Sequence, residues 1–166
     1  SDHPNSPTDP TRFLKALLKV NHRIKLVFYG PVVLNKKWQE YFGDRLEINE
    51  TVSHTKALEL MRTMDVLLVA YSEINGGGEV ITGKLFEYFL AQRSVLVVGP
   101  KNMEAARLVM ENHLGYCIDI MNDDEMVTTL DEIYKEWQLG QLVSYSLDDV
   151  VEFSRQKQFA KLLEIL

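Results

Sequence analysis

The stretch Glu79–Gly99, which reads EVITGKLFEYFLAQRSVLVVG, contains the pattern of a helix followed by the pattern of a strand. In its first part the large apolar residues stand at Leu85, Phe86, Phe89 and Leu90. This spacing places apolar side chains on one stripe of a helix that faces a core. We therefore predict a helix over Gly83–Gln92.

The second part, Ser94–Val98, is an almost entirely apolar run that ends at Gly99-Pro100. A short run of Val and Leu that closes on a turn signal is typical of a strand buried on both faces. Strands of this kind occur in parallel sheets that helices cover on both sides. The stretch therefore predicts one helix-and-strand unit of a parallel α/β fold.

The same alternation of helix and strand patterns extends over the rest of the chain. Further strands are predicted at Ile24–Tyr29, Leu46–Val52, Asp65–Tyr71 and Gly115–Ile120. Further helices are predicted at Thr11–Val20, Asn35–Phe42, His54–Met64, Met103–Asn112, Asp123–Trp137 and Leu147–Leu166. Strands that alternate with helices in this way predict a doubly wound, Rossmann-like parallel sheet.

The chain has 166 residues, for which one domain is the default. We place this domain at residues 11–166, with the helix Leu147–Leu166 packed along its surface. Ser1–Pro10 is rich in Pro, Ser and Asp and is predicted to be a disordered leader.

The composition excludes several classes of protein. An apolar content of 46% allows a substantial core. A net charge of −6 with no basic cluster argues against non-specific binding of nucleic acid. No segment is long and apolar enough to span a membrane, and no signal peptide is visible, so we expect a cytoplasmic location.

Familiar catalytic and nucleotide motifs are also missing from the sequence. The single cysteine, Cys117, excludes an internal disulfide and lies in an apolar run, which indicates a buried and unreactive thiol. The histidines are scattered without metal-ligand spacing, at His3, His22, His54 and His113. The glycine patterns of dinucleotide-binding domains, phosphate-loop NTPases and esterases are absent.

The start of the predicted helix carries a pattern suited to an anion. Thr82 fits an N-cap, and Gly83 allows a ligand to approach the backbone closely. Free N–H groups and the helix dipole favour an anion at this end. A bound phosphate would offset the small cost of placing Lys84 in the first turn. The alternative is that Lys84 is an exposed lysine without a partner.

Two carboxylates flank this segment, eight positions apart. Glu87 lies one turn into the predicted helix, where it could accept hydrogen bonds from the hydroxyls of a sugar or ribose. Glu79 follows the glycines Gly76–Gly78 and could reach a second group of the same ligand. The alternative is that both are solvated surface acids, the commonest fate of glutamate.

Two predicted strands end in a Gly-Pro pair, at Gly30-Pro31 and at Gly99-Pro100. In folds of this class ligands bind beyond the carboxyl ends of the strands. Glycine gives room there, and proline forces an extended exit of the chain. The alternative is a simple turn from strand to loop.

Three segments together resemble a known family. They are GKLFEYFLA at Gly83–Ala91, SVLVVG at Ser94–Gly99, and His54-x-x-Ala-Leu-x-x-Met-x-x-x-Asp-Val-Leu-Leu upstream. They resemble the C-terminal, donor-binding domain of retaining GT-B glycosyltransferases of the large group-1 family. The GKLFEY version is typical of members that build polysaccharides. The resemblance covers Pro10–Leu166.

The resemblance implies a role for each residue of the helix start. The family's two glutamates with seven residues between them match Glu79 and Glu87. Glu87 would then bind the ribose of a nucleotide diphosphate sugar, and Glu79 would face the transferred sugar as the catalytic residue. Thr82, Gly83 and Lys84 would line the diphosphate.

The resemblance also implies where the base of the nucleotide lies. The family's base pocket follows the strand that matches Leu46–Val52, which points to Val52, Ser53 and His54. Gly30 matches the glycine that closes the strand before it. His54 could equally be a helix-start residue with no ligand.

The implied reaction is transfer of a hexosyl unit from an NDP-sugar to a hydroxyl, in the synthesis of a polysaccharide or glycoconjugate. It implies no metal and no cofactor besides the donor substrate. The full enzyme has a second Rossmann-like domain that supplies the acceptor site, so we expect this portion alone to be inactive. The full enzyme would be open to peripheral membrane association. The last helix would expose an apolar face and promote self-association.

Two other classes stay open at this point. One is a flavodoxin-like or receiver-like binding module that performs no chemistry. The other is half of a sugar-nucleotide epimerase, a related two-domain fold. Against a receiver, no aspartate ends a predicted central strand. Against an epimerase, the histidine content is thin.

Overall fold

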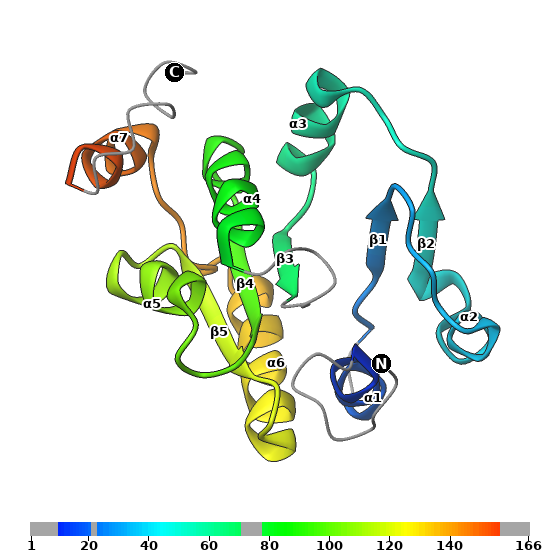
Figure 1. The fold of residues 1–166 in the computed structure, drawn as a ribbon. Helices are drawn as coiled ribbons and strands as arrows, with labels where there is room; N and C mark the ends of the chain where they lie inside the picture. The colour runs from blue at the N-terminus through cyan, green and yellow to red at the C-terminus, as the bar shows by residue number, and fades with distance from the viewer. Residues whose placement is uncertain (1–9, 21–22, 71–77, 157–166) are drawn as a thin grey trace.

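The computed structural model describes residues 10–20, 23–70 and 78–156, without the side chains of 10, 78–83 and 153–156. Helices and strands alternate along the chain (Figure 1). The helices are α1 (Pro10–Lys19), α2 (Lys36–Phe42), α3 (His54–Arg62), α4 (Gly78–Leu90), α5 (Glu104–Glu111), α6 (Asp123–Gln138) and α7 (Leu147–Gln156), with a 3-10 turn at Gly43–Arg45. The strands are β1 (Leu26–Tyr29), β2 (Leu46–Asn49), β3 (Val66–Ala70), β4 (Ser94–Gly99) and β5 (Gly115–Asp119).

The described strands form two parallel sheets. β1 pairs with β2, with Leu26 opposite Leu46. The second sheet has the order β3-β4-β5, with Val66 opposite Ser94. The prediction of a parallel α/β fold is confirmed. The prediction of one continuous sheet is not met, because β1 and β3 do not pair.

The three-stranded sheet is covered on both faces. All six residues of β4 are buried. Val95 and Val97 face the apolar cluster that contains α4 and α5, whereas Leu96 and Val98 face the cluster that contains α1 and α6. Successive side chains of a strand point to opposite faces, so an unbroken apolar run is what a strand between two helix layers requires.

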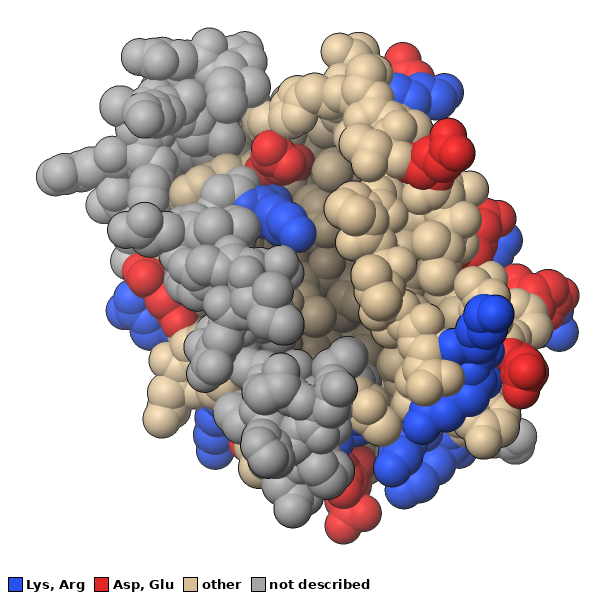
Figure 2. Space-filling view, turned by 45° about the vertical axis from the view of Figure 1, so that its right-hand side comes forward, with Lys and Arg blue, Asp and Glu red and all other residues tan. Residues whose placement is uncertain are grey.

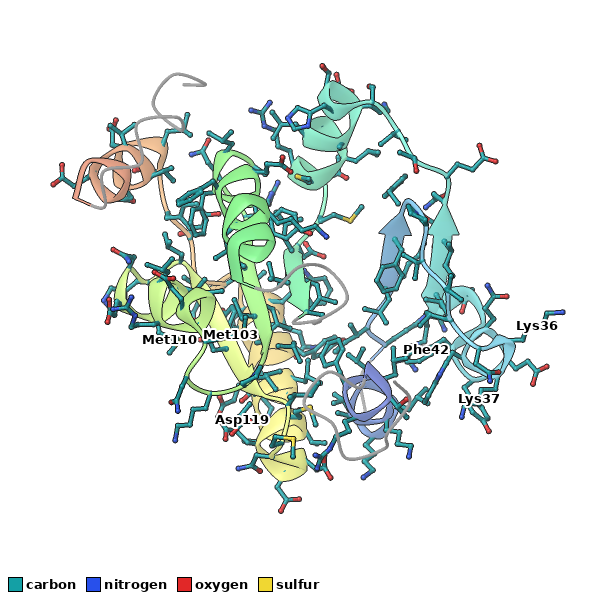
Figure 3. All side chains as sticks on the ribbon, viewed as in Figure 1. Lys36, Lys37, Phe42, Met103, Met110 and Asp119 are labelled. Atoms are coloured by element: carbon teal, nitrogen blue, oxygen red, sulfur yellow. The ribbon has the colours of Figure 1, made fainter. Side chains whose placement is uncertain are left out.

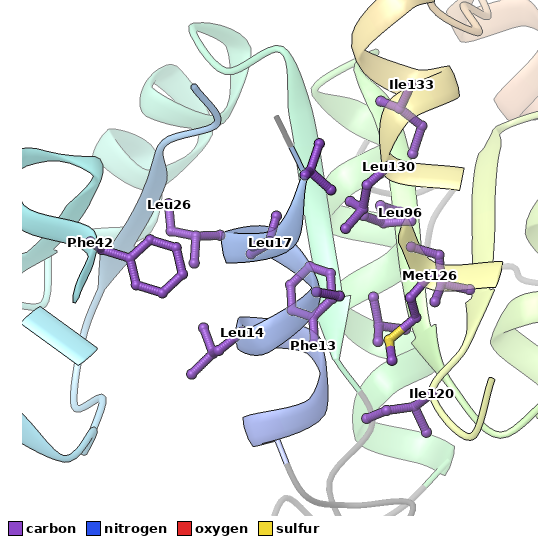
Figure 4. Close-up of a cluster of buried hydrophobic side chains, with 14 of the residues drawn as sticks. Phe13, Leu14, Leu17, Leu26, Phe42, Leu96, Ile120, Met126, Leu130 and Ile133 are labelled. Atoms are coloured by element: carbon purple, nitrogen blue, oxygen red, sulfur yellow. The ribbon is translucent and has the colours of Figure 1, made fainter. Parts of the chain in front are cut away.

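Helix α1 joins the two sheets through its apolar face. Figure 4 shows Leu14 of α1 lying toward Leu26 and Phe42. These two residues belong to the two-stranded side of the molecule, which consists of β1, α2 and β2. Phe13 of α1 lies toward Met126 of α6. All five side chains are buried in one cluster. Because this cluster spans both sides, burial of α1 stabilises their association.

Polar contacts hold α1 to the same two sides. Arg12 Nε lies 3.2 Å from the Asp123 carboxylate at the start of α6. On the other side, Arg45 Nε donates to the Ile24 carbonyl at 3.0 Å, and its Nη2 donates to the Leu17 carbonyl at 3.4 Å. Arg45 thus links the end of α1 to the segment that leads into β1.

Most of the predicted boundaries agree with the structure. All five predicted strands are present, although β2 ends at Asn49 rather than Val52. The predicted helices are present too, and the last one is described as far as Gln156. The residues 157–166 and Ser1–Asp9, which include most of the predicted leader, lie outside the described residues. Pro10 is the first residue of α1.

Candidate functional site

A hollow of about 510 Å³ lies between β1 and β3. The space-filling view shows the molecule hollowed, and the described residues of the wall are mostly uncharged (Figure 2). The rim of the hollow at the carboxyl ends of the strands is lined by Tyr29, Val32, Thr51, Val52, Lys84 and Glu87. These residues come from the ends of β1 and β2 and from α4, so three parts of the chain meet here.

The position of the hollow follows from the topology. The chain runs from β1 outward to β2, returns through α3 to β3, and then continues through β4 to β5. The strand order therefore reverses between β1 and β3. In open α/β sheets the helices diverge at such a reversal, and ligands bind in the crevice outside the carboxyl ends of the strands.

Two charged residues of α4 line the hollow together. Lys84 and Glu87 are three positions apart, so they lie on neighbouring positions of one helix face. Lys84 is exposed and Glu87 is half-buried. Within the described residues, neither side chain forms a hydrogen bond or an ion pair. Both charges are therefore available to a ligand in the hollow.

The other basic residue that lines the hollow is paired. Lys25, which also lines the hollow, lies 3.2 Å from the Glu47 carboxylate on the neighbouring strand. A hydrogen bond from Asn49 and the nearby Lys25 lower the pKa of Glu47. Figure 3 shows Lys36 and Lys37 pointing outward from α2, away from α4. Lys84 is thus the cation best placed to meet an anion at the strand ends.

The start of α4 differs from the prediction. The helix begins at Gly78 rather than Gly83, so Thr82 lies inside the helix and is not its N-cap. Glu79 lies in the first helical turn, not on a loop. The first four N–H groups of a helix, those of the N-cap and the next three residues, have no partner within it, and among the described residues of α4 these belong to 78–80. Gly83 and Lys84 therefore do not supply free N–H groups. The side chains of Glu79 and Thr82 lie outside the described residues.

Tyr88 fixes α4 against the hollow. Its hydroxyl donates to the Leu68 carbonyl of β3 at 3.1 Å, and both residues line the hollow. Burial, together with the nearby charge of Glu87, raises the pKa of Tyr88. The Tyr145 hydroxyl lies 3.3 Å from the Tyr88 carbonyl on the other side of the helix. These contacts hold Glu87 beside the end of β3.

The segment after β2 was predicted to hold Val52, Ser53 and His54 in the site, and Val52 does line the hollow. Ser53 is instead the N-cap of α3, where its hydroxyl accepts from the Lys56 N–H at 3.2 Å. His54 is the exposed first residue of α3. Neither lines the hollow, whereas Thr51 and Val52 do. The reading of His54 as a helix-start residue fits this placement.

Gly30 lies at the edge of the hollow without lining it. Its φ of +109° lies in a region that L side chains rarely adopt, and its N–H donates to the Asn49 carbonyl at 3.0 Å. Its neighbours Tyr29 and Val32 line the hollow. Gly30 therefore shapes the exit of β1 and turns the chain out of the strand end.

Sequence reasoning missed part of this lining. Tyr29 ends a predicted strand and could have been chosen on that position alone. Thr51 lay inside the predicted strand over Leu46–Val52, so its place in the loop was not apparent. Met64 and Tyr88 also line the hollow, although neither was named as a candidate site residue.

Residues 10–20, 23–70 and 78–156 contain neither a metal-binding cluster nor a membrane-spanning helix. No group of three or more His, Cys, Asp or Glu side chains there is arranged to hold a metal ion. In the same ranges, every helix is too short or too polar to cross a bilayer.

The sequence was compared with known proteins. No model of a known protein family matches the chain. No curated protein matches it significantly either.

Proposed function

We propose that the chain is the donor-binding domain of a GT-B glycosyltransferase, one Rossmann-like half of the enzyme. The full enzyme would move a hexosyl unit from an NDP-sugar to a hydroxyl acceptor in polysaccharide or glycoconjugate synthesis. The observation that supports this best is the placement of Lys84 and Glu87 in one hollow at the carboxyl ends of β1 and β3. A lysine beside a carboxylate suits a ligand with a phosphate and neighbouring hydroxyls.

We assign residues of the hollow to the diphosphate, the ribose and the base of the donor. The Lys84 ammonium would contact the diphosphate, and the Glu87 carboxylate would accept hydrogen bonds from the ribose hydroxyls. Thr51 and Val52 would contact the base in place of Ser53 and His54. The diphosphate would also face the N–H groups of the first turn of α4, where the helix dipole favours an anion.

The proposed chemistry follows from the charge that develops on the leaving group. As the bond between sugar and diphosphate breaks, negative charge grows on the diphosphate oxygens. The Lys84 ammonium and unpaired N–H groups would stabilise this charge more than they stabilise the ground state, which is how such groups accelerate a reaction. Glu79 keeps the role implied by the resemblance, facing the transferred sugar. The acceptor would bind to the second domain, so this portion would bind donor without turnover.

The alternative of a receiver-like module receives little support. Asp119 ends β5, but its Oδ1 accepts from the Met121 N–H at 3.0 Å and so closes a turn. Figure 3 places Asp119 at the far end of β5 from α3. A receiver needs an acid that is free to accept a phosphoryl group, and Asp119 is engaged in its own loop.

Calorimetric titration tests the proposal. UDP, GDP and their hexose conjugates are titrated into the 166-residue chain. We expect one nucleotide class to bind, and Lys84→Ala and Glu87→Gln each to weaken it by about tenfold or more. Lys36→Ala and Glu111→Gln are the matched controls, since both residues are exposed and neither lines the hollow. No heat of binding from any nucleotide, or equal affinity in all four variants, would contradict the proposal.

A further inference from the structure

The segment that joins α6 to α7 is held in place by side chains of the three-stranded sheet. It has no regular secondary structure over residues 141–146, and it passes beside α4 on its way to α7 (Figure 1). Backbone groups in such a segment have no ladder or helix in which to pair, so side chains must bind them wherever they are buried. Here those side chains come from β4 and β5.

Val143 of this segment is bound at both of its backbone groups. Its N–H donates to the Tyr116 hydroxyl of β5 at 3.0 Å. Its carbonyl accepts from the hydroxyl of Ser94, the first residue of β4, which is only 4% exposed. Two neighbouring strands therefore hold this one residue, and they fix the path of the chain that follows it.

Tyr145, two positions further on, reaches from Val143 to the end of α4. Its ring packs edge-on against Phe89, with the ring centres 6.0 Å apart. Its hydroxyl donates to the Arg93 carbonyl at 2.6 Å and lies 3.3 Å from the Tyr88 carbonyl. Tyr88 belongs to the last turn of α4 and Arg93 directly precedes β4, so one hydroxyl spans the connection between the helix and the strand.

This connection is a tight turn with few contacts of its own. Gln92 has a φ of +57°, which is uncommon for a residue other than glycine. The Gln92 N–H donates to the Phe89 carbonyl and the Ala91 N–H to the Tyr88 carbonyl, each at 3.1 Å. The last carbonyls of a helix lack partners within it, so contacts from outside decide how firmly the end is held. Tyr145 supplies such a contact.

The turn of α4 that Tyr145 holds is the one that faces the hollow. Glu87 and Tyr88 both line the hollow, and the Tyr88 hydroxyl donates to the Leu68 carbonyl of β3 at 3.1 Å. The helix end is thus tied to β3 on one side and to the segment 141–146 on the other. Within the described part of the chain Glu87 forms no hydrogen bond of its own, so its position follows that of the helix end.

We propose that Tyr145 is a positioning residue of the donor site, which holds the end of α4 so that Glu87 meets the ribose hydroxyls. The inference rests on the proposed function for the identity of the ligand. Tyr145 does not line the hollow, so it acts through the backbone of Tyr88 and Arg93 rather than on the ligand. Burial raises the pKa of Tyr145, so its hydroxyl keeps the proton that it donates.

Tyr145→Phe removes the hydroxyl and keeps the ring against Phe89. It is tested in the 166-residue chain by calorimetric titration with UDP or GDP, whichever binds, and with the dideoxy analogue that lacks both ribose hydroxyls. The analogue keeps the base and the diphosphate but offers Glu87 nothing to bind. We expect the substitution to weaken the ribonucleotide by about five- to tenfold and the analogue by about twofold or less. A general loss of stability would weaken both alike.

Two further variants show whether the effect passes through Glu87. In a chain that already carries Glu87→Ala, Tyr145→Phe should cost about twofold or less, because the group that it positions is absent. Tyr41→Phe is the matched control, since Tyr41 is 62% exposed on α2 and does not line the hollow. It should bind both nucleotides as the unmodified chain does.

Hydrogen exchange in the chain without ligand tests the contact itself. We expect Tyr145→Phe to speed exchange about fivefold or more at the amides of Ala91 and Gln92. The Val95 amide of β4, which donates to the Leu114 carbonyl at 3.1 Å, should be unchanged. A global loss of stability would instead speed exchange at Val95 as well.

Two results would overturn the inference. Equal weakening of the ribonucleotide and its dideoxy analogue would show that the Tyr145 hydroxyl only stabilises the fold. Unchanged exchange at Ala91 and Gln92 would show that it does not hold the end of α4. Either result leaves the proposed function intact if a nucleotide binds, whereas an unmodified chain that binds no nucleotide would contradict the proposed function and this inference together.

Discussion

The three-stranded side of the molecule and the two-stranded side differ in how completely they are buried. Every residue of β4 is buried, and helices cover it on both faces. In β1 only Leu26 is buried, and Tyr29 at its end is 37% exposed. Both sides read as apolar strands in the sequence, so apolar content alone does not determine how a strand is covered.

Because of this difference, we expect the residues that stabilise the fold and the residues that bind a ligand to lie in different parts of the molecule. Burial of apolar surface is the dominant favourable term in folding, so the three-stranded side should carry most of the stability. The side chains left free to meet a ligand line the space between the two sides, where β1 and β3 each lack a partner strand. Residues that bind are commonly held on an open rim by a rigid scaffold, and here β3, β4 and β5 form that scaffold.

The largest expected effect compares two phenylalanines. Phe89 of α4 is fully buried against β4, whereas Phe28 of β1 is half-buried. We expect Phe89→Ala to lower the free energy of unfolding by about 3–5 kcal/mol, because it leaves a cavity in a packed core. Phe28→Ala should cost less than half as much. Urea unfolding followed by circular dichroism measures both.

Equal losses from the two substitutions would contradict the comparison. They would mean that the two-stranded side contributes to stability as strongly as the three-stranded side. A larger loss for Phe28→Ala would reverse the assignment of the scaffold.

The next effect compares two glycines. A Cβ on Gly115 would lie 1.9 Å from the Val95 carbonyl oxygen of β4, so β5 must move away from its neighbour. We expect Gly115→Ala to cost about 1–3 kcal/mol or more. A Cβ on Gly30 would lie no closer than 3.7 Å to its nearest neighbour, Thr51, so only its φ of +109° resists substitution. Gly30→Ala should cost about 1 kcal/mol.

Thermal or urea unfolding of the two glycine variants provides the measurement. A harmless Gly115→Ala would mean that β4 and β5 are less closely packed than the structure has them. In that event the three-stranded side would not be the rigid part of the molecule.

A smaller effect concerns alkaline pH on the three-stranded side. Burial, supported by a hydrogen bond to Glu136, raises the pKa of Tyr116 from 10.0 to about 12. The unfolded chain therefore releases this proton from about pH 10 while the folded chain retains it, so stability falls as pH rises from 10 to 12. Cys117 is half-buried rather than fully buried as predicted, and burial raises the pKa of its thiol to about 12, which adds to the same trend.

Tyr116→Phe separates the tyrosine from the other groups. It removes the titrating hydroxyl, and it also removes the acceptor that the Val143 N–H meets at 3.0 Å. We expect lower stability at neutral pH but a shallower decline above pH 10. Parallel curves for the two proteins over this range would show that Tyr116 titrates in the same way folded and unfolded.

The sequence patterns predicted the elements better than their ends and assembly. Apolar periodicity located the strands, because a buried strand and an amphipathic helix have different spacing. It could not tell which strands pair, so the separation of β1 from β3 was missed. Trp137 continues the apolar spacing of α6 in the sequence, which is typical of a residue that faces the core. It is 45% exposed, because the last turn of α6 lines a second hollow, of about 350 Å³, on the side covered by α1 and α6.

The start of α4 shows why a local rule failed at the site. Thr82 and the preceding glycines matched the pattern of a cap after a loop, which placed the helix start at Gly83. Once a helix is nucleated, each further residue adds a hydrogen bond at little cost, so α4 extends back to Gly78. Lys84 and Glu87 were still predicted as neighbours on one helix, since their spacing does not depend on where the helix begins.

Backbone NMR of the chain during titration with UDP- and GDP-hexoses tests the central claim most directly. The account predicts that the amides of Thr51, Val52, Lys84 and Glu87 shift together with a single dissociation constant, while those of β5 and α5 stay unchanged. Shifts confined to α5 and β5, or none at any amide around the hollow up to saturating ligand, would contradict it.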